Sequence, residues 1–166
     1  MTIPGVLGFI GFGNMGRAIA KGLVQAGAIP ADRLLAFDVK PESAKRVEEI
    51  GGVALESAAA LAERSQTLLL APKPQDMEVA LDSIAAHLGA ESLVISIAAG
   101  ISISYIQGVL GSERHVARVM PNTPALVGAG AAGIALSASC TEEDAGVAEA
   151  IFESVGIAER LPESAL

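Results

Sequence analysis

Residues 6–16 read Val-Leu-Gly-Phe-Ile-Gly-Phe-Gly-Asn-Met-Gly, so that an apolar run leads directly into the pattern Gly-x-Gly-x-x-Gly. The run from Val6 to Ile10 predicts a strand, and the apolar spacing after Gly16 predicts a helix. Glycine permits a tight turn at Gly11, a close approach to a pyrophosphate at Gly13, and close packing of helix on strand at Gly16. The stretch therefore predicts a dinucleotide site at the start of a helix, the alternative being a glycine turn that serves packing alone.

Composition narrows the classes of protein to consider. A length of 166 residues suits a single domain. With 51% hydrophobic residues and 18 Gly, the chain is unusually apolar. This excess predicts parallel strands buried on both faces and a surface that meets a partner. The net charge of −8, with few aromatic residues, argues against nucleic acid as a partner.

One cysteine and the absence of long apolar runs bear on location. Cys140 alone excludes an internal disulfide and a thiolate metal cluster, and it fits a reducing compartment. We interpret it as an idle or buried thiol rather than a nucleophile. No charged segment precedes the apolar start, and no run approaches the roughly 18 apolar residues of a membrane span. We expect a cytoplasmic protein without a membrane partner.

Apolar runs and helical patterns alternate along the chain. Further strands are expected at 34–37, 53–55, 67–70, 93–97, 131–136 and 157–161, together with one that follows His115 and ends at Val119. Helices are expected at 41–50, after Ser57, at 77–88, within 104–110 and after Thr141. This alternation predicts an α/β fold, with a Rossmann-like, doubly wound and mostly parallel sheet, helices on both faces, and ligand bound at the carboxyl ends of the strands. We assign residues 1–161 to this domain. His87, at the end of a helix, and His115, at a strand edge, receive no catalytic role.

The end of the second strand bears on the choice of cofactor. Asp38 lies 22 residues beyond Gly16, close to the position where a carboxylate meets the adenosine ribose of NAD. Lys40, Lys45 and Arg46 follow, and they could instead hold the 2′-phosphate of NADP. Asp38 could also be a turn or helix-cap residue. We therefore predict NADP or NAD as the cofactor, with Asp38 tilting the choice slightly toward NAD.

Three later loops follow strands at the same predicted edge. Ala71-Pro72-Lys73-Pro74 is stiffened by two prolines, Ala98-Ala99-Gly100 is small enough to leave room for a nicotinamide, and Asn122-Thr123 offers an amide and a hydroxyl. Each could also be an ordinary surface loop. The predicted cofactor-binding residues are Ile10, Gly11, Phe12, Gly13, Asn14, Met15, Gly16, Asp38, Ala71, Pro72, Lys73, Pro74, Ala98, Ala99, Gly100, Asn122 and Thr123. No residue is predicted to be catalytic or to bind a metal.

The chain resembles pyrroline-5-carboxylate reductase, the last enzyme of proline synthesis, in four motifs. These are Gly8 to Gly16, Lys73-Pro74, Ser96-Ile-Ala-Ala-Gly100 and Met120-Pro-Asn-Thr-Pro-Ala-Leu-Val127, in the order of the family. The resemblance implies NAD(P)H held by the loops above, with Asn122 and Thr123 near the nicotinamide, and hydride transfer to the C=N carbon of 1-pyrroline-5-carboxylate, giving L-proline. Pro72 departs from the family, which usually has valine there, and it removes an N–H donor.

The resemblance also implies a part that this sequence lacks. Members of the family continue into a helical dimerisation domain that carries most of the substrate site, and residues 162–166 would begin the connection to it. We therefore expect a truncated chain, a proteolytic fragment or a natural short form, inactive or weakly active alone, and a homo-oligomeric whole protein. Two alternatives stay open: a non-catalytic or regulatory dinucleotide-binding module, and a related imine or hydroxyacid reductase.

Overall fold

The computed structural model describes residues 2–166 and contains one sheet of eight strands. The order of strands across the sheet is β3-β2-β1-β4-β5-β6-β7-β8, and every neighbouring pair is parallel except β6 with β7. The order runs outward in both directions from β1 and β4, so the predicted doubly wound Rossmann-like fold is confirmed. The strands are β1 (Leu7–Ile10), β2 (Leu34–Phe37), β3 (Val53–Ala54), β4 (Thr67–Leu70), β5 (Leu93–Ser96), β6 (His115–Met120), β7 (Gly130–Leu136) and β8 (Gly156–Arg160).

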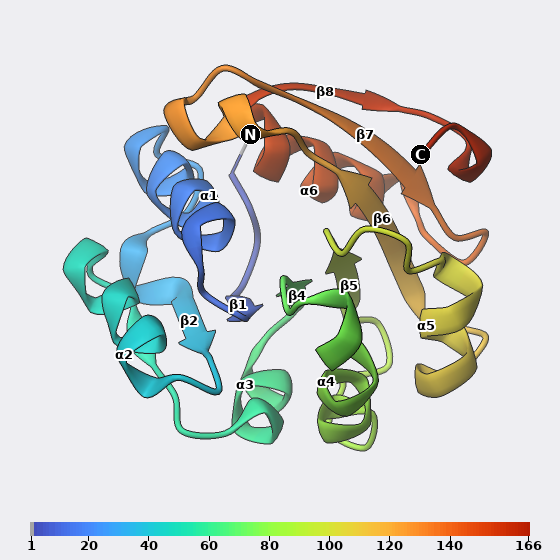
Figure 1. The fold of residues 1–166 in the computed structure, drawn as a ribbon, viewed down its shortest axis with the longest axis horizontal. Helices are drawn as coiled ribbons and strands as arrows, with labels where there is room; N and C mark the ends of the chain where they lie inside the picture. Colours follow the sequence, from blue (N-terminus) through green and yellow to red (C-terminus); the bar gives the residue numbers. More distant parts are fainter. Residues whose placement is uncertain (1) are drawn as a thin grey trace.

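Helices cover both faces of the sheet, as Figure 1 shows with α1 and α6 above the central strands and α3, α4 and α5 below them. Phe152 of α6 and Leu23 of α1 belong to one apolar cluster, whereas Leu61 of α3 and Ile106 of α5 belong to the other. The helices are α1 (Asn14–Gln25), α2 (Pro41–Ala44), α3 (Ala58–Arg64), α4 (Met77–Ile84), α5 (Ile103–Leu110) and α6 (Glu142–Glu153). Short 3₁₀ turns are η1 (Ala31–Arg33), η2 (Lys45–Ile50), η3 (Pro74–Asp76), η4 (Thr123–Val127) and η5 (Glu163–Ala165).

The central strands are buried on both faces, which explains why they read as continuous apolar runs. In β1, Phe9 packs in the cluster under α1 and α6, while Ile10 packs in the cluster under α3 to α5. Burying an aliphatic or aromatic side chain of this size stabilises the fold by about 1.5–3 kcal/mol. The two layers of helices therefore explain much of the apolar excess in the composition.

Two predicted helices and one predicted loop differ from the structure. The helix expected over residues 41–50 is α2 followed by the tighter η2, which ends at Gly51 in the left-handed region with φ of 93°. The helix expected to reach Leu88 ends at Ile84, because Leu88 turns into the core and His87 pairs with Glu63, with Nδ1 to Oε1 at 2.7 Å. His87 is therefore not in the last turn of that helix. The predicted loop after β6, which contains two prolines, forms the short 3₁₀ turn η4.

The last residues pack on the same domain. The Oε2 atom of Glu163 accepts a hydrogen bond from the backbone N–H of Ile103 at 2.8 Å and one from Arg118 Nη1 at 3.2 Å. Leu166 packs against the cluster under α3 to α5. That residues 162–166 lead to a further domain remains a prediction. Among residues 2–166, no helix combines the length and the apolar character that a bilayer span requires.

Candidate functional site

The carboxyl ends of the parallel strands meet at one edge of the sheet. Ile10 is in register with Phe37 on one side and with Leu70 on the other, and Leu70 is in register with Ser96. The ladders continue one residue further, because Gly11 N–H donates to the Phe37 carbonyl at 2.8 Å and Ala71 N–H donates to the Ile10 carbonyl at 2.8 Å. The loops predicted to bind the cofactor therefore leave the sheet side by side.

The three glycines of the turn differ in what surrounds them. Gly11 has φ of 86°, and a Cβ there would lie 2.7 Å from the carbonyl oxygen of Ala71, so both backbone conformation and space require glycine. A Cβ on Gly16 would lie 3.2 Å from the Gly11 carbonyl oxygen, at the packing of helix on turn. A Cβ on Gly13 would meet nothing within 4 Å. Gly13 thus faces open space, and nothing inside the protein accounts for its lack of a side chain.

The start of α1 carries donors without an internal acceptor. Its N-cap residue is Gly13, which provides no side-chain cap, and the first turn has no acidic residue. A helix begins with N–H groups that have no partner in the helix, together with the positive end of its dipole. The start of α1 therefore presents N–H groups and partial positive charge to the open space in front of Gly13.

Asp38 links the end of β2 to the glycine turn. Its Oδ2 accepts a hydrogen bond from the backbone N–H of Phe12 at 2.8 Å, and its Oδ1 accepts one from the backbone N–H of Lys40 at 2.9 Å. Phe12 is itself anchored, since its buried ring packs edge-on against Phe9 with centroids 5.3 Å apart. The carboxylate therefore braces the turn, in addition to any contact with a ligand.

The two middle loops put small residues and one cation at this edge. Ala98 is buried with its N–H donating to Ser96 Oγ at 3.2 Å, whereas Ala99 and Gly100 are exposed, Gly100 with φ of 75°. Lys73 is exposed and occupies the N-cap position of η3 without a side-chain hydrogen bond, and the preceding Pro72 is partly buried. These loops leave room at the edge and add one positive charge beside it.

The loop after β6 continues into η4, which contacts α1 and lines a groove together with Phe12 and Asn14 through Leu126. The Oδ1 atom of Asn122 accepts a hydrogen bond from the Ala131 backbone N–H at 2.8 Å, which orients the amide with its nitrogen as the donor left for a ligand. Thr123 is exposed, and η4 packs against α1. Asn122 is therefore held in place by the fold, as a positioning residue needs to be.

Burial divides the predicted residues into two groups. Ile10, Phe12, Gly16 and Ala98 are buried, so only their backbone atoms can meet a ligand, and the side chains of the three that are not glycine pack inside the fold. The other predicted residues are exposed or partly exposed: Gly11, Gly13, Asn14, Met15, Asp38, Ala71, Pro72, Lys73, Pro74, Ala99, Gly100, Asn122 and Thr123.

A groove beside the glycine turn was not anticipated from the sequence. It has a volume of about 500 Å³ and lies between α1, η2 and η4. Arg17 of α1 donates to Asn14 Oδ1 at 2.6 Å, and Lys21 and Arg46 also line the groove. The spacing of residues 14, 17, 18 and 21 on one helical face is the signal that could have indicated it.

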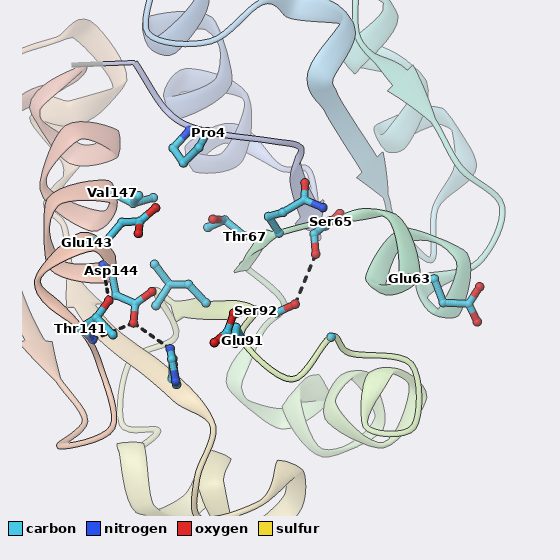
Figure 2. Close-up of a pocket in the computed structure, with 14 residues that line it drawn as sticks. Pro4, Glu63, Ser65, Thr67, Glu91, Ser92, Thr141, Glu143, Asp144 and Val147 are labelled. Carbon is cyan, nitrogen blue, oxygen red and sulfur yellow. Dashed lines mark hydrogen bonds and ion pairs between the residues drawn. The ribbon is translucent and has the colours of Figure 1, made fainter.

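A second hollow lies at the opposite edge of the sheet, where the strands begin (Figure 2). It measures about 460 Å³, and Thr141, Glu143 and Asp144 lie on one side of it, with Ser65 and Thr67 on the other. His115 Nδ1 is 2.8 Å from Asp144 Oδ2 and forms an ion pair with it when the imidazole is protonated. We place the functional site at the other edge, because the helix-start donors and the glycine turn are there.

Cys140 behaves as a structural thiol. Its Sγ donates to the Val116 carbonyl at 3.4 Å, and burial raises the pKa of the Cys140 thiol, an effect that the hydrogen bond with Ser137 only partly offsets. A thiol held protonated is a poor nucleophile. Within residues 2–166, no group of three or more His, Cys, Asp or Glu side chains is placed to hold a metal ion.

The chain matches a known family and several known proteins. The family model described as NADP oxidoreductase coenzyme F420-dependent matches residues 6–100. The pyrroline-5-carboxylate reductase of Escherichia coli (strain K12) is 37% identical over 158 residues, which are 95% of this chain and 59% of that protein. The pyrroline-5-carboxylate reductase of Methanosarcina acetivorans is 38% identical over 159 residues, which are 95% of this chain and 59% of that protein. The chain thus spans about three fifths of the length of these relatives.

Solved structures give the same result. A pyrroline-5-carboxylate reductase from Coxiella burnetii superposes with a TM-score of 0.92 at 28% identity, over 96% of this chain and 59% of that one. The Plasmodium falciparum pyrroline carboxylate reductase, solved with NADP bound, superposes with a TM-score of 0.86 at 30% identity, over 98% of this chain and 60% of that one.

Proposed function

This chain belongs to the NADP oxidoreductase coenzyme F420-dependent family, and from that premise we propose that it is the cofactor-binding part of a pyrroline-5-carboxylate reductase. The observation that carries the proposal is the meeting of four predicted loops at one sheet edge, around the open space in front of Gly13. The reductases that the chain resembles, one of them solved with NADP bound, support the same assignment.

The residues present fit a dinucleotide. The uncapped start of α1 and the open space at Gly13 suit a pyrophosphate, and we assign Asp38, which is hydrogen-bonded to the same turn, to the adenosine ribose. The exposed Ala99 and Gly100 leave room for the nicotinamide, with Asn122 offering its amide nitrogen to the carboxamide. We expect these residues, with Lys73, to bind and orient the cofactor.

When bound, NAD(P)H supplies a hydride to the C=N carbon of 1-pyrroline-5-carboxylate, which becomes L-proline. A protonated imine already accepts hydride well, so the protein has mainly to hold two rings in a reactive orientation. No side chain at this edge is assigned as a general acid. Because this chain corresponds to only about three fifths of the reductases that it resembles, we expect the 166-residue chain by itself to bind cofactor with almost no turnover.

A chimera tests the proposal. This chain, joined to the segment of the Escherichia coli relative that lies beyond the matched region, should convert 1-pyrroline-5-carboxylate to proline with NADH or NADPH. The Asp32→Asn chimera is the control, because Asp32 is exposed in η1 before β2, at the opposite edge. A folded chimera that binds cofactor but reduces only an oxo acid, giving a hydroxyacid, or another imine would contradict the assignment of substrate. Cofactor binding without any reduction would favour the non-catalytic module.

Two further properties follow from the proposal. We expect the whole protein to be a homo-oligomer that assembles through a segment beyond residue 166, and sedimentation of the chimera against this chain alone would test it. We also expect a cytoplasmic location, which cell fractionation of the source organism can check.

A further inference from the structure

We infer that this chain selects NADH over NADPH, and that Asp38 makes the selection because the fold holds its carboxylate in place. The inference rests on the proposed function, and it concerns which of the two dinucleotides the site takes. It starts from the two hydrogen bonds of Asp38, from Phe12 N–H at 2.8 Å and from Lys40 N–H at 2.9 Å.

Both oxygens of Asp38 are engaged, so the side chain cannot swing aside without a cost. If it rotated away, the N–H of Phe12, whose side chain is buried, would lose its acceptor within the glycine turn. Each carboxylate oxygen still has a second lone pair, with which it can accept a hydrogen bond from a ribose hydroxyl. The 2′-hydroxyl of NADH therefore finds an acceptor that is already oriented.

The 2′-phosphate of NADPH would instead be repelled by the Asp38 carboxylate. It would bring negative charge against a carboxylate that two backbone N–H groups hold in place, and like charges in contact strongly disfavour a ligand. Val39, the next residue, is 85% exposed and apolar, so it supplies no cation at the position directly after the carboxylate. The end of β2 thus lacks the arginine that usually accommodates a 2′-phosphate at this place.

The first part of the chain is rich in lysine and arginine, which could bind the 2′-phosphate of NADPH. Six of the eleven Lys and Arg residues lie within the first 46 residues, against three of the nineteen acidic ones. Arg17, Lys21 and Arg46, however, line the groove between α1, η2 and η4, and Asp38 does not line it. Arg17 is also engaged with Asn14. Lys40 lies nearest to Asp38 in sequence, and it is therefore the cation to test.

The test is calorimetric titration of the 166-residue chain with NADH and with NADPH, for the native sequence and three variants. The native chain should bind NADH at least about tenfold more tightly than NADPH. Asp38→Asn keeps an oxygen for the Phe12 N–H but removes the charge, and it should shift the ratio of the two dissociation constants at least about tenfold toward NADPH. Asp32→Asn, which removes an exposed acidic charge at the opposite edge, should leave the ratio unchanged.

Lys40→Ala separates the two explanations. If Lys40 held a 2′-phosphate, this variant would lose affinity for NADPH alone, and that result would overturn the inference. Equal or tighter binding of NADPH by the native chain would overturn it too, while leaving the proposed function intact. A ratio that does not change in Asp38→Asn would also overturn it. Binding of neither dinucleotide would refute the proposed function, and the inference with it.

Discussion

Two alanine substitutions in the glycine turn separate what the fold needs from what a ligand needs. Gly11 has φ of 86°, and a Cβ there would lie 2.7 Å from the backbone oxygen of Ala71. The left-handed conformation costs a non-glycine residue about 1–2 kcal/mol, before any displacement of the neighbouring backbone. Gly11→Ala should therefore destabilise the chain by about 2 kcal/mol or more, which lowers the melting temperature of a domain of this size by about 4–8 °C.

Gly13→Ala should leave the stability of the chain almost unchanged and weaken the binding of NADH. The φ of Gly13 is −83°, and an added Cβ meets nothing within 4 Å, so the free energy of unfolding should change by less than about 0.5 kcal/mol. The same methyl group enters the space in front of the start of α1, where we expect the pyrophosphate. Affinity for NADH should then fall by at least about tenfold, equivalent to about 1.4 kcal/mol.

Thermal unfolding followed by circular dichroism, together with calorimetric titration with NADH, measures both quantities on each variant. Unchanged NADH affinity in Gly13→Ala would refute the claim that phosphates approach the backbone at this turn. A fully stable Gly11→Ala chain would refute the interpretation of Gly11 as a residue that the fold requires.

Three further predictions concern stability and the thiol. Thr141→Ala breaks the capping box in which Thr141 and Asp144 exchange hydrogen bonds of 2.8 and 3.1 Å, so denaturant titration should show a loss of about 1 kcal/mol. Phe152→Ala opens a cavity at a ring only 1% exposed, and the same measurement should show a loss of about 3–5 kcal/mol. Because burial raises the pKa of the Cys140 thiol above its ordinary value of 9.0, the folded chain holds this proton more tightly than the unfolded chain. Stability should therefore fall as the pH rises past that ordinary value, and Cys140→Ala should lessen the fall.

Much of the fold could be predicted from local pattern. The bounds of β2 and β4 agree with the runs predicted at 34–37 and 67–70, because strands buried on both faces are mostly apolar. Ser57 and Thr141 cap α3 and α6 as expected, since a cap depends on neighbours within three residues. Features set by local sequence were therefore predicted well.

Individual side-chain contacts between residues distant in sequence were not predicted. The hydrogen bond from Phe12 to Asp38 joins residues 26 apart, and the contacts of Glu163 with Arg118 and Ile103 join residues 45 and 60 apart. The pairing of His87 with Glu63, outside the helix expected to contain His87, is of the same kind. Such contacts arise only when the strands are assembled, so no periodicity in the sequence indicates them.

Titration of the ¹⁵N-labelled chain with NADH, followed by amide chemical shifts, tests most directly whether the cofactor binds at the glycine turn. We predict saturable shifts at the amides of residues 12–15, of Ala71 and Lys73, and of residues 98–100, with little change at the opposite edge around Ser65 and Asp144. The absence of shifts, or shifts gathered in the hollow at that opposite edge, would contradict this placement of the cofactor.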